Sequence, residues 1–126
     1  MQRIAILGGG RMGEALLAGL LDAGYAPDAL AVAEAHADRR QELETRAPGT
    51  RIGPSASWAV ADADVAIGYY GVGIENALAE IANRRGRLVV HIAANDAYCP
   101  PAAQAQINEA LQGREGVEVY TYPGVG

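Results

Sequence analysis

Several residue types that mark particular classes of protein are scarce or missing in this sequence. The single cysteine, Cys99, cannot form a disulfide within the chain, and two histidines add few ligands for a metal site. All ten basic residues are arginine, and fifteen acidic residues bring the net charge to −5. A chain with this charge has no basic field to attract a phosphate backbone, so we expect no nucleic-acid partner.

Long apolar segments are also missing. The apolar runs are only as long as β-strands, and residues 1–7 lack the pattern of a signal peptide. We therefore expect a cytoplasmic protein with no membrane partner. The 126 residues, of which 50% are hydrophobic and 20% charged, have the composition of a globular chain. This length suits one domain over residues 1–126 and is too short for a cofactor domain plus a substrate domain.

Short apolar runs alternate along the chain with longer amphipathic segments, a pattern typical of parallel βαβ units. It predicts an α/β protein with a three-layer, doubly wound parallel sheet, Rossmann-like, whose six strands lie in the order 3-2-1-4-5-6. The expected strands are 3–7, 30–34, 51–53, 65–70, 88–93 and 117–122, and the expected helices are 12–23, 38–47, 57–63, 74–83 and 102–111.

The most informative motif is GGGRMG, which we call the glycine turn; it follows the first expected strand and opens the first expected helix. In this context G-x-G-x-x-G is typical of dinucleotide-binding proteins. Gly8 would make the tight turn, Gly10 would let the backbone approach a pyrophosphate, and Gly13 would allow close packing of helix and strand. The start of the helix, with Arg11 and Met12, would supply N–H donors. The same glycines would also suit a tight connection without any ligand.

Glu34 ends the second expected strand, where an acidic side chain would meet the ribose of a dinucleotide. A carboxylate there favours the free 2′-hydroxyl of NAD and repels the 2′-phosphate of NADP. His36, Arg39 and Arg40 follow closely and could offset that repulsion. NADP and NAD therefore both remain as ligands of the glycine turn.

The first half of the chain resembles the start of pyrroline-5-carboxylate reductase. The similar segments are RIAILGGGRMGEALLAGLL from Arg3, then VAE from Val32 and ADADV from Ala61. This resemblance covers residues 1–65 and implies a Rossmann domain that binds NAD(P)H through the glycine turn. The Lys-Pro pair that the family has after the next strand is absent. The family's helical C-terminal domain, which carries dimerisation and most of the substrate site, has no counterpart here, so we expect a monomer.

Residues 66–126 resemble a second family, the dienelactone hydrolases of the α/β-hydrolase fold. The similar segments are AIGYYGVGIE from Ala66, HIAANDAYCPP from His91 and VEVYTYPGVG from Val117. The resemblance implies that Asp96 occupies the position of the triad acid. The glycine turn, which has no Ser or Cys, takes the place of the nucleophile, and the chain stops before the position of the catalytic histidine. Asp96 is therefore a vestigial triad acid.

Together these resemblances favour an engineered chimera, joined near residues 62–66, that has no native catalytic activity and is not an enzyme. Such a chain requires no cofactor and would retain at most residual binding of NADP or NAD. Two alternatives remain open: a fragment of an NAD(P)-dependent reductase, and a hydrolase that acts through Cys99 or a water held by Asp96. Cys99 itself is expected to be an inert loop residue, and His91 a hydrogen-bonded core residue.

Overall fold

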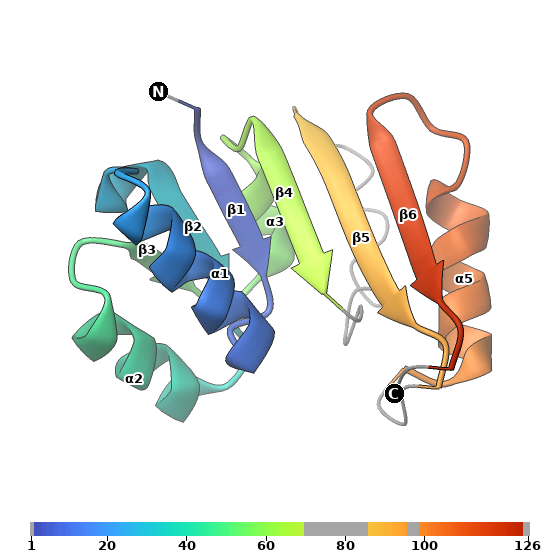
Figure 1. Ribbon diagram of the computed structural model, residues 1–126, viewed down its shortest axis with the longest axis horizontal. Coiled ribbons are helices and arrows are strands. Elements are labelled where there is room, and N and C mark those ends of the chain that lie inside the picture. Colours follow the sequence, from blue (N-terminus) through green and yellow to red (C-terminus); the bar gives the residue numbers. More distant parts are fainter. Residues whose placement is uncertain (1, 70–85, 96–98, 125–126) are drawn as a thin grey trace.

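The computed structural model describes residues 2–69, 86–95 and 99–124. Six strands form one sheet in the order β3-β2-β1-β4-β5-β6, and every neighbouring pair is parallel (Figure 1). The predicted fold class and strand order are thus confirmed. The strands are β1 (Ile4–Leu7), β2 (Leu30–Ala33), β3 (Arg51–Gly53), β4 (Val65–Tyr69), β5 (Arg87–Ala93) and β6 (Val117–Tyr122).

Helices connect these strands close to the predicted positions. The expected helix 74–83 lies outside the described residues. The expected helix 57–63 ends earlier, at Val60, because the chain then turns into the sheet, where the backbone N–H of Asp64 donates to the carbonyl of Arg3. The elements are α1 (Arg11–Asp22), the short 3-10 helix η1 (Pro27–Ala29), α2 (Ala37–Arg46), α3 (Ala56–Val60) and α5 (Pro101–Leu111). None of these described helices combines the length and apolar character needed to cross a membrane.

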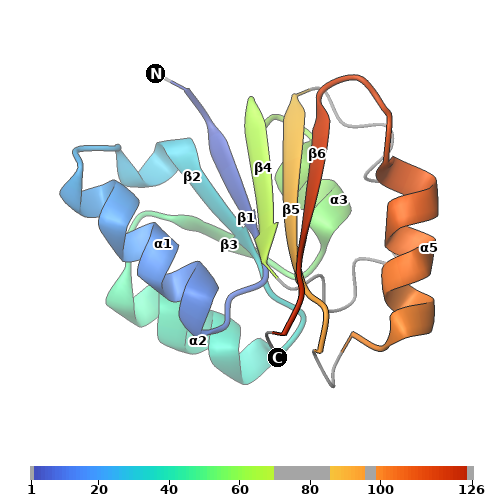
Figure 2. The ribbon, with the colours of Figure 1, turned by 45° about the vertical axis from the view of Figure 1, so that its right-hand side comes forward.

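The helices lie in two layers, with α1 and α2 on one face of the sheet and α3 and α5 on the other (Figures 1 and 2). Alternate residues of β1 therefore belong to different cores: Ile4 and Ile6 pack toward Leu17 and Leu43, while Ala5 joins the cluster of the opposite face. Burial on both faces explains why the first two strands are apolar without interruption.

The region near residues 62–66, where we expected a joint, is tied into the sheet on both sides. Asp64 accepts a hydrogen bond from the backbone N–H of Arg3 through its side chain at 2.8 Å, and its carbonyl accepts one from Arg87 at 2.8 Å. Ile67 lies beside Ile6 in the β1–β4 register and packs on the same cluster as Leu16. The backbone pairing is therefore continuous through this region.

The outer strands are less enclosed than the central ones. Leu88, Val90 and Ile92 of β5 are buried toward α5, whereas none of the described helices covers the opposite face of β5 and β6 (Figures 1 and 2). Tyr120 and Tyr122 on β6 are exposed. The sheet thus has one well-enclosed side, at β1 and β2, and one open face, at β5 and β6.

Candidate functional site

The glycine turn connects the carboxyl end of β1 to α1, and two of its glycines are required by the backbone geometry. Gly8 has φ +105°, a conformation that favours glycine, and its N–H donates to the carbonyl of Ala33 at 2.8 Å. A Cβ atom on Gly13 would lie 2.0 Å from the carbonyl oxygen of Gly8. These are the tight turn and the close helix–strand packing that the sequence predicted for these two positions.

Gly10 differs from these two because the fold itself does not require it. It is the N-cap of α1 with φ −72°, and a Cβ atom on it would meet nothing within 4 Å. Among the residues that the structure describes, no side chain caps the helix, so the first-turn N–H groups, among them those of Arg11 and Met12, have neither an intrahelical partner nor a cap there. Open space beside unsatisfied donors is what a bound anionic group needs.

Glu34 lies directly beside the glycine turn, where β2 ends. One carboxylate oxygen accepts the N–H of Gly9 at 3.0 Å, and the other accepts the backbone N–H of His36 at 2.7 Å. The second oxygen also lies 2.9 Å from the Nδ1 atom of the His36 ring. Burial alone would raise the pKa of Glu34, but the hydrogen bonds from His36 and Gly9 outweigh it and lower the pKa below its ordinary value.

The Glu34 side chain is only 10% exposed, while that of His36 is 86% exposed. The carboxylate of Glu34 is therefore directed toward the glycine turn. Its negative charge is already paired with N–H groups of the protein. Arg40 strengthens this corner by donating from one Nη atom to the carbonyls of Glu34 and Ala35, at 2.9 Å each. The sequence identified Glu34, but it did not predict that Glu34 would hold the glycine turn in place.

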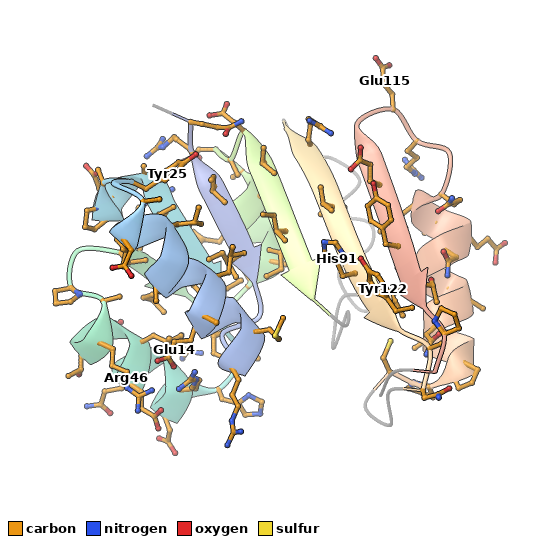
Figure 3. The ribbon with its side chains drawn as sticks, in the orientation of Figure 1. Glu14, Tyr25, Arg46, His91, Glu115 and Tyr122 are labelled. Carbon is orange, nitrogen blue, oxygen red and sulfur yellow. The ribbon has the colours of Figure 1, made fainter. Side chains whose placement is uncertain are left out.

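A second charged group supports the turn from the side of α2. Arg39 donates from Nε to the carbonyl of Gly9 at 2.6 Å and also pairs with Glu14 of α1. Arg46 donates to both carboxylate oxygens of Glu14, at 2.9 and 3.0 Å, and Figure 3 shows these two side chains together between α1 and α2. The hydrogen bond from Arg39, opposed by burial and assisted by Arg46, lowers the pKa of Glu14. Sequence reasoning missed Glu14 entirely.

The residues that would serve a hydrolase are not assembled in the described part of the chain. Asp96 lies outside the described residues, so its vestigial role is not visible. Cys99 is buried with 0% exposure, and its carbonyl accepts a hydrogen bond from Gln104 at 2.7 Å. A thiol buried in this way is not presented to a substrate, which agrees with the expectation of an inert residue.

His91 was expected to be a hydrogen-bonded core residue, and the structure corrects its burial. Its Nδ1 atom does lie 2.8 Å from the hydroxyl of Tyr122, and the two labelled side chains meet in Figure 3. The ring also stacks on Tyr120 at 5.5 Å between centroids. However, His91 is only half-buried, because it points to the face of β5 that no described helix covers (Figure 3). Among the described residues, no group of three His, Cys, Asp or Glu side chains could hold a metal ion.

This fold and glycine turn define a Rossmann-like dinucleotide-binding domain. The family described as "NADP oxidoreductase coenzyme F420-dependent" matches residues 3–95, and the chain belongs to that family. The family implies binding of a nicotinamide dinucleotide. It also matches continuously through residues 62–66, so it lends no support to a chimeric or engineered origin.

Solved structures support the fold. A pyrroline-5-carboxylate reductase from Coxiella burnetii has a TM-score of 0.67 at 16% identity, over 89% of this chain and 40% of its own. A putative short chain dehydrogenase/reductase family oxidoreductase from Aeromonas hydrophila has a TM-score of 0.60 at 16% identity, over 98% of this chain and 80% of its own. At these identities the likeness shows the fold alone.

A putative carboxymethylenebutenolidase from Azospirillum brasilense is 36% identical over 64 residues, which are 51% of this chain and 28% of that protein. This match fits the hydrolase resemblance loosely and does not establish a chimera. The chain thus spans 28% of this curated relative.

The expectation that the chain is not an enzyme is contradicted, because the chain belongs to a family of NADP oxidoreductases. That expectation relied on missing triad residues and a missing substrate domain. The missing triad does not bear on hydride transfer, which uses no hydrolase triad. The alternative of an NAD(P)-dependent reductase fragment is better supported than the inactive chimera.

Proposed function

We propose that residues 1–126 form one domain that binds a nicotinamide dinucleotide in an NAD(P)-dependent reductase. The pyrophosphate would lie on Gly8, Gly10, Arg11, Met12 and Gly13. The observation that carries this proposal is the uncapped start of α1, which presents N–H donors beside an open Gly10 at the carboxyl edge of the sheet. Membership in a family of NADP oxidoreductases supports the same ligand.

The residues of the turn fit such a ligand by their shape as well as by their donors. The space around Gly10 accommodates a close backbone approach, and the positive end of the α1 dipole favours a negative group there. When bound, the dinucleotide supplies the hydride for a reduction. The chain's own contribution is to hold and orient the pyrophosphate and ribose, so that the nicotinamide end is directed across the carboxyl edge of the sheet.

We propose NADP as the preferred form, with Glu34 beside the adenosine ribose. The carboxylate of Glu34 already accepts hydrogen bonds from Gly9 and His36, which reduces its repulsion of a 2′-phosphate. The exposed His36 ring lies 2.9 Å from the same carboxylate, and Arg40 adds positive charge at this corner. Parallel titrations with NADPH and NADH test this preference, and tighter binding of NADH would contradict it.

The substrate would be a small compound with a reducible carbonyl or imine, bound with the help of a separate domain. Pyrroline-5-carboxylate, named for one structural relative, is the first compound to assay with NADPH. That the chain is a monomer, and that it binds neither nucleic acid nor a membrane, remain predictions. Sedimentation of the purified protein measures its oligomeric state.

Two glycine variants test the site without disturbing the fold. In Gly10→Ala the new methyl group meets nothing in the protein but would stand where the pyrophosphate approaches, so NADPH should bind about tenfold more weakly. Gly19→Ala, in the middle of α1, also adds a methyl group in open space and should leave binding unchanged. Calorimetric titration measures both affinities. Equal affinity of the two variants, or no binding by the unaltered chain, would overturn the proposal.

A further inference from the structure

Arg39 makes an unusual set of contacts for a residue in the first turn of a surface helix. Besides the hydrogen bond from Nε to the carbonyl of Gly9, a second nitrogen lies 3.4 Å from the carbonyl of Gly10. The same nitrogen also meets the carboxylate of Glu14, and the third nitrogen donates to Glu42 at 2.9 Å. The side chain is 22% exposed, so these contacts are partly shielded from water.

Arg39 holds the carbonyl of Gly9, and it adds to the hold on the carbonyl of Gly10, which also accepts the N–H of Glu14 at 2.9 Å as the first hydrogen bond of α1. In a trans peptide the carbonyl and the following N–H point in opposite directions, and no described peptide bond is cis. Drawing the carbonyls of Gly9 and Gly10 toward α2 therefore turns the N–H groups of Gly10 and Arg11 away from α2. Those two N–H groups belong to the donors that the proposed function assigns to the pyrophosphate.

We propose that Arg39 is a positioning residue for the dinucleotide site, which acts by holding the carbonyl side of the glycine turn. This inference rests on the proposed function. Arg39 does not act as a direct phosphate ligand, because its donors are directed to the turn carbonyls and to two carboxylates that balance its charge. Its contribution is to prepare the turn before a ligand arrives, which lowers the cost of ordering these peptide groups on binding.

Arg46 provides a matched control within the same cluster. It shares Glu14 with Arg39, and Figure 3 shows both Glu14 and Arg46 between α1 and α2. Within the described residues its hydrogen bonds go to the Glu14 carboxylate and not to the carbonyls of the turn. A variant of Arg46 therefore loses the ion pair with Glu14 of α1 but keeps the hydrogen bonds from Arg39 to the turn carbonyls.

The experiment compares Arg39→Met with Arg46→Met in calorimetric titrations with NADPH. We expect about tenfold weaker binding for Arg39→Met, because two hydrogen bonds from a charged group to the turn are lost, and near-normal binding for Arg46→Met. Amide hydrogen exchange of the ligand-free chain gives a second readout. Exchange at Gly8 and Gly9, whose N–H groups donate to Ala33 and Glu34, should accelerate in Arg39→Met and stay unchanged in Arg46→Met.

The possible outcomes separate this inference from the proposed function. If the unaltered chain does not bind NADPH, both fail; if it binds and the two Met variants bind equally, only the role of Arg39 is wrong. Should Arg39→Met lose its cooperative melt, Arg39→Lys and Arg46→Lys replace the pair. Lysine retains the charge but not the fork of donors, so Arg39→Lys should bind more weakly than Arg46→Lys. Equal affinity of the two Lys variants would contradict the proposal.

Discussion

The two halves of the sheet differ in how completely their strands are enclosed. Every residue of β1 and β2 is buried, whereas β6 is half-buried along its first three residues and exposed along its last three. The enclosed strands carry the glycine turn and Glu34 at their carboxyl ends, with Arg39 holding the turn from outside. The candidate site thus lies where the backbone is most enclosed. The open face of β5 and β6 carries a polar network of its own, in which Glu118 accepts from Arg87 and Tyr120 and His91 meets Tyr122, but its side chains are largely exposed.

The largest expected effect comes from the tightest contact in the enclosed half. Gly13→Ala would place a Cβ atom 2.0 Å from the carbonyl oxygen of Gly8, so strand β1 and helix α1 would have to separate. We expect a loss of about 3 kcal/mol or more in the free energy of unfolding. Urea denaturation measures it, with Gly19→Ala as the tolerated control. A stability close to that of the unaltered chain would show that the turn is looser than described.

A cavity in the enclosed half should cost more than a truncation on the open face. Leu43 is 0% exposed and packs below the glycine turn, so Leu43→Ala should lower the free energy of unfolding by about 2–5 kcal/mol. Tyr122 is 42% exposed, and Tyr122→Ala should cost about 1 kcal/mol. Equal losses in urea denaturation would mean that the open face is in fact covered.

The pH dependence of stability tests the role of Glu34. Because the pKa of Glu34 is lower in the folded chain than its ordinary value, the folded state favours the charged carboxylate. Its contribution is present above the ordinary value of 4.5 and is lost as the pH falls through the folded-state pKa. In Glu34→Gln this part of the acid loss should disappear, along with about 1 kcal/mol at neutral pH. Identical stability curves from pH 2 to 7 for variant and unaltered chain would refute this role.

The smallest effect should come from a single hydrogen bond on the open face. Tyr122→Phe removes the hydroxyl that lies 2.8 Å from Nδ1 of His91 but keeps the ring. Water can replace that partner on an exposed surface, so we expect a change of at most about 0.5 kcal/mol in thermal denaturation. A loss comparable to that of Leu43→Ala would show that this pair is shielded from water.

Much of the fold could be predicted from the sequence because the alternation of apolar runs and amphipathic segments is local. The structural roles of Gly8 and Gly13 followed for the same reason, since a motif of six residues fixes its own turn. Arg39 could not be placed in this way, because it meets Gly9 across 30 positions in the sequence. Likewise, the half-exposed setting of His91 depends on whether a helix covers that face, which the strand's own residues do not specify.

The interpretation as a chimera is not confirmed, and the expectation that the chain is inactive is contradicted. Separate segments that resemble two families do not show that the chain was joined from two proteins. A single family model matches residues 3–95, which include the expected joint. The backbone pairing from Arg3 to Asp64 and Arg87 also runs through the supposed joint. Local resemblance therefore identified the dinucleotide-binding half but misjudged the activity.

The most direct test is an NMR titration of the nitrogen-15-labelled chain with NADPH, because backbone N–H signals report the proposed donors themselves. The account predicts saturable shifts concentrated at residues 8–13 and 33–36, with little change at the exposed Tyr120 and Tyr122 of β6. A well-dispersed spectrum that does not change at millimolar NADPH, or changes only along β5 and β6, would contradict a dinucleotide site at the glycine turn.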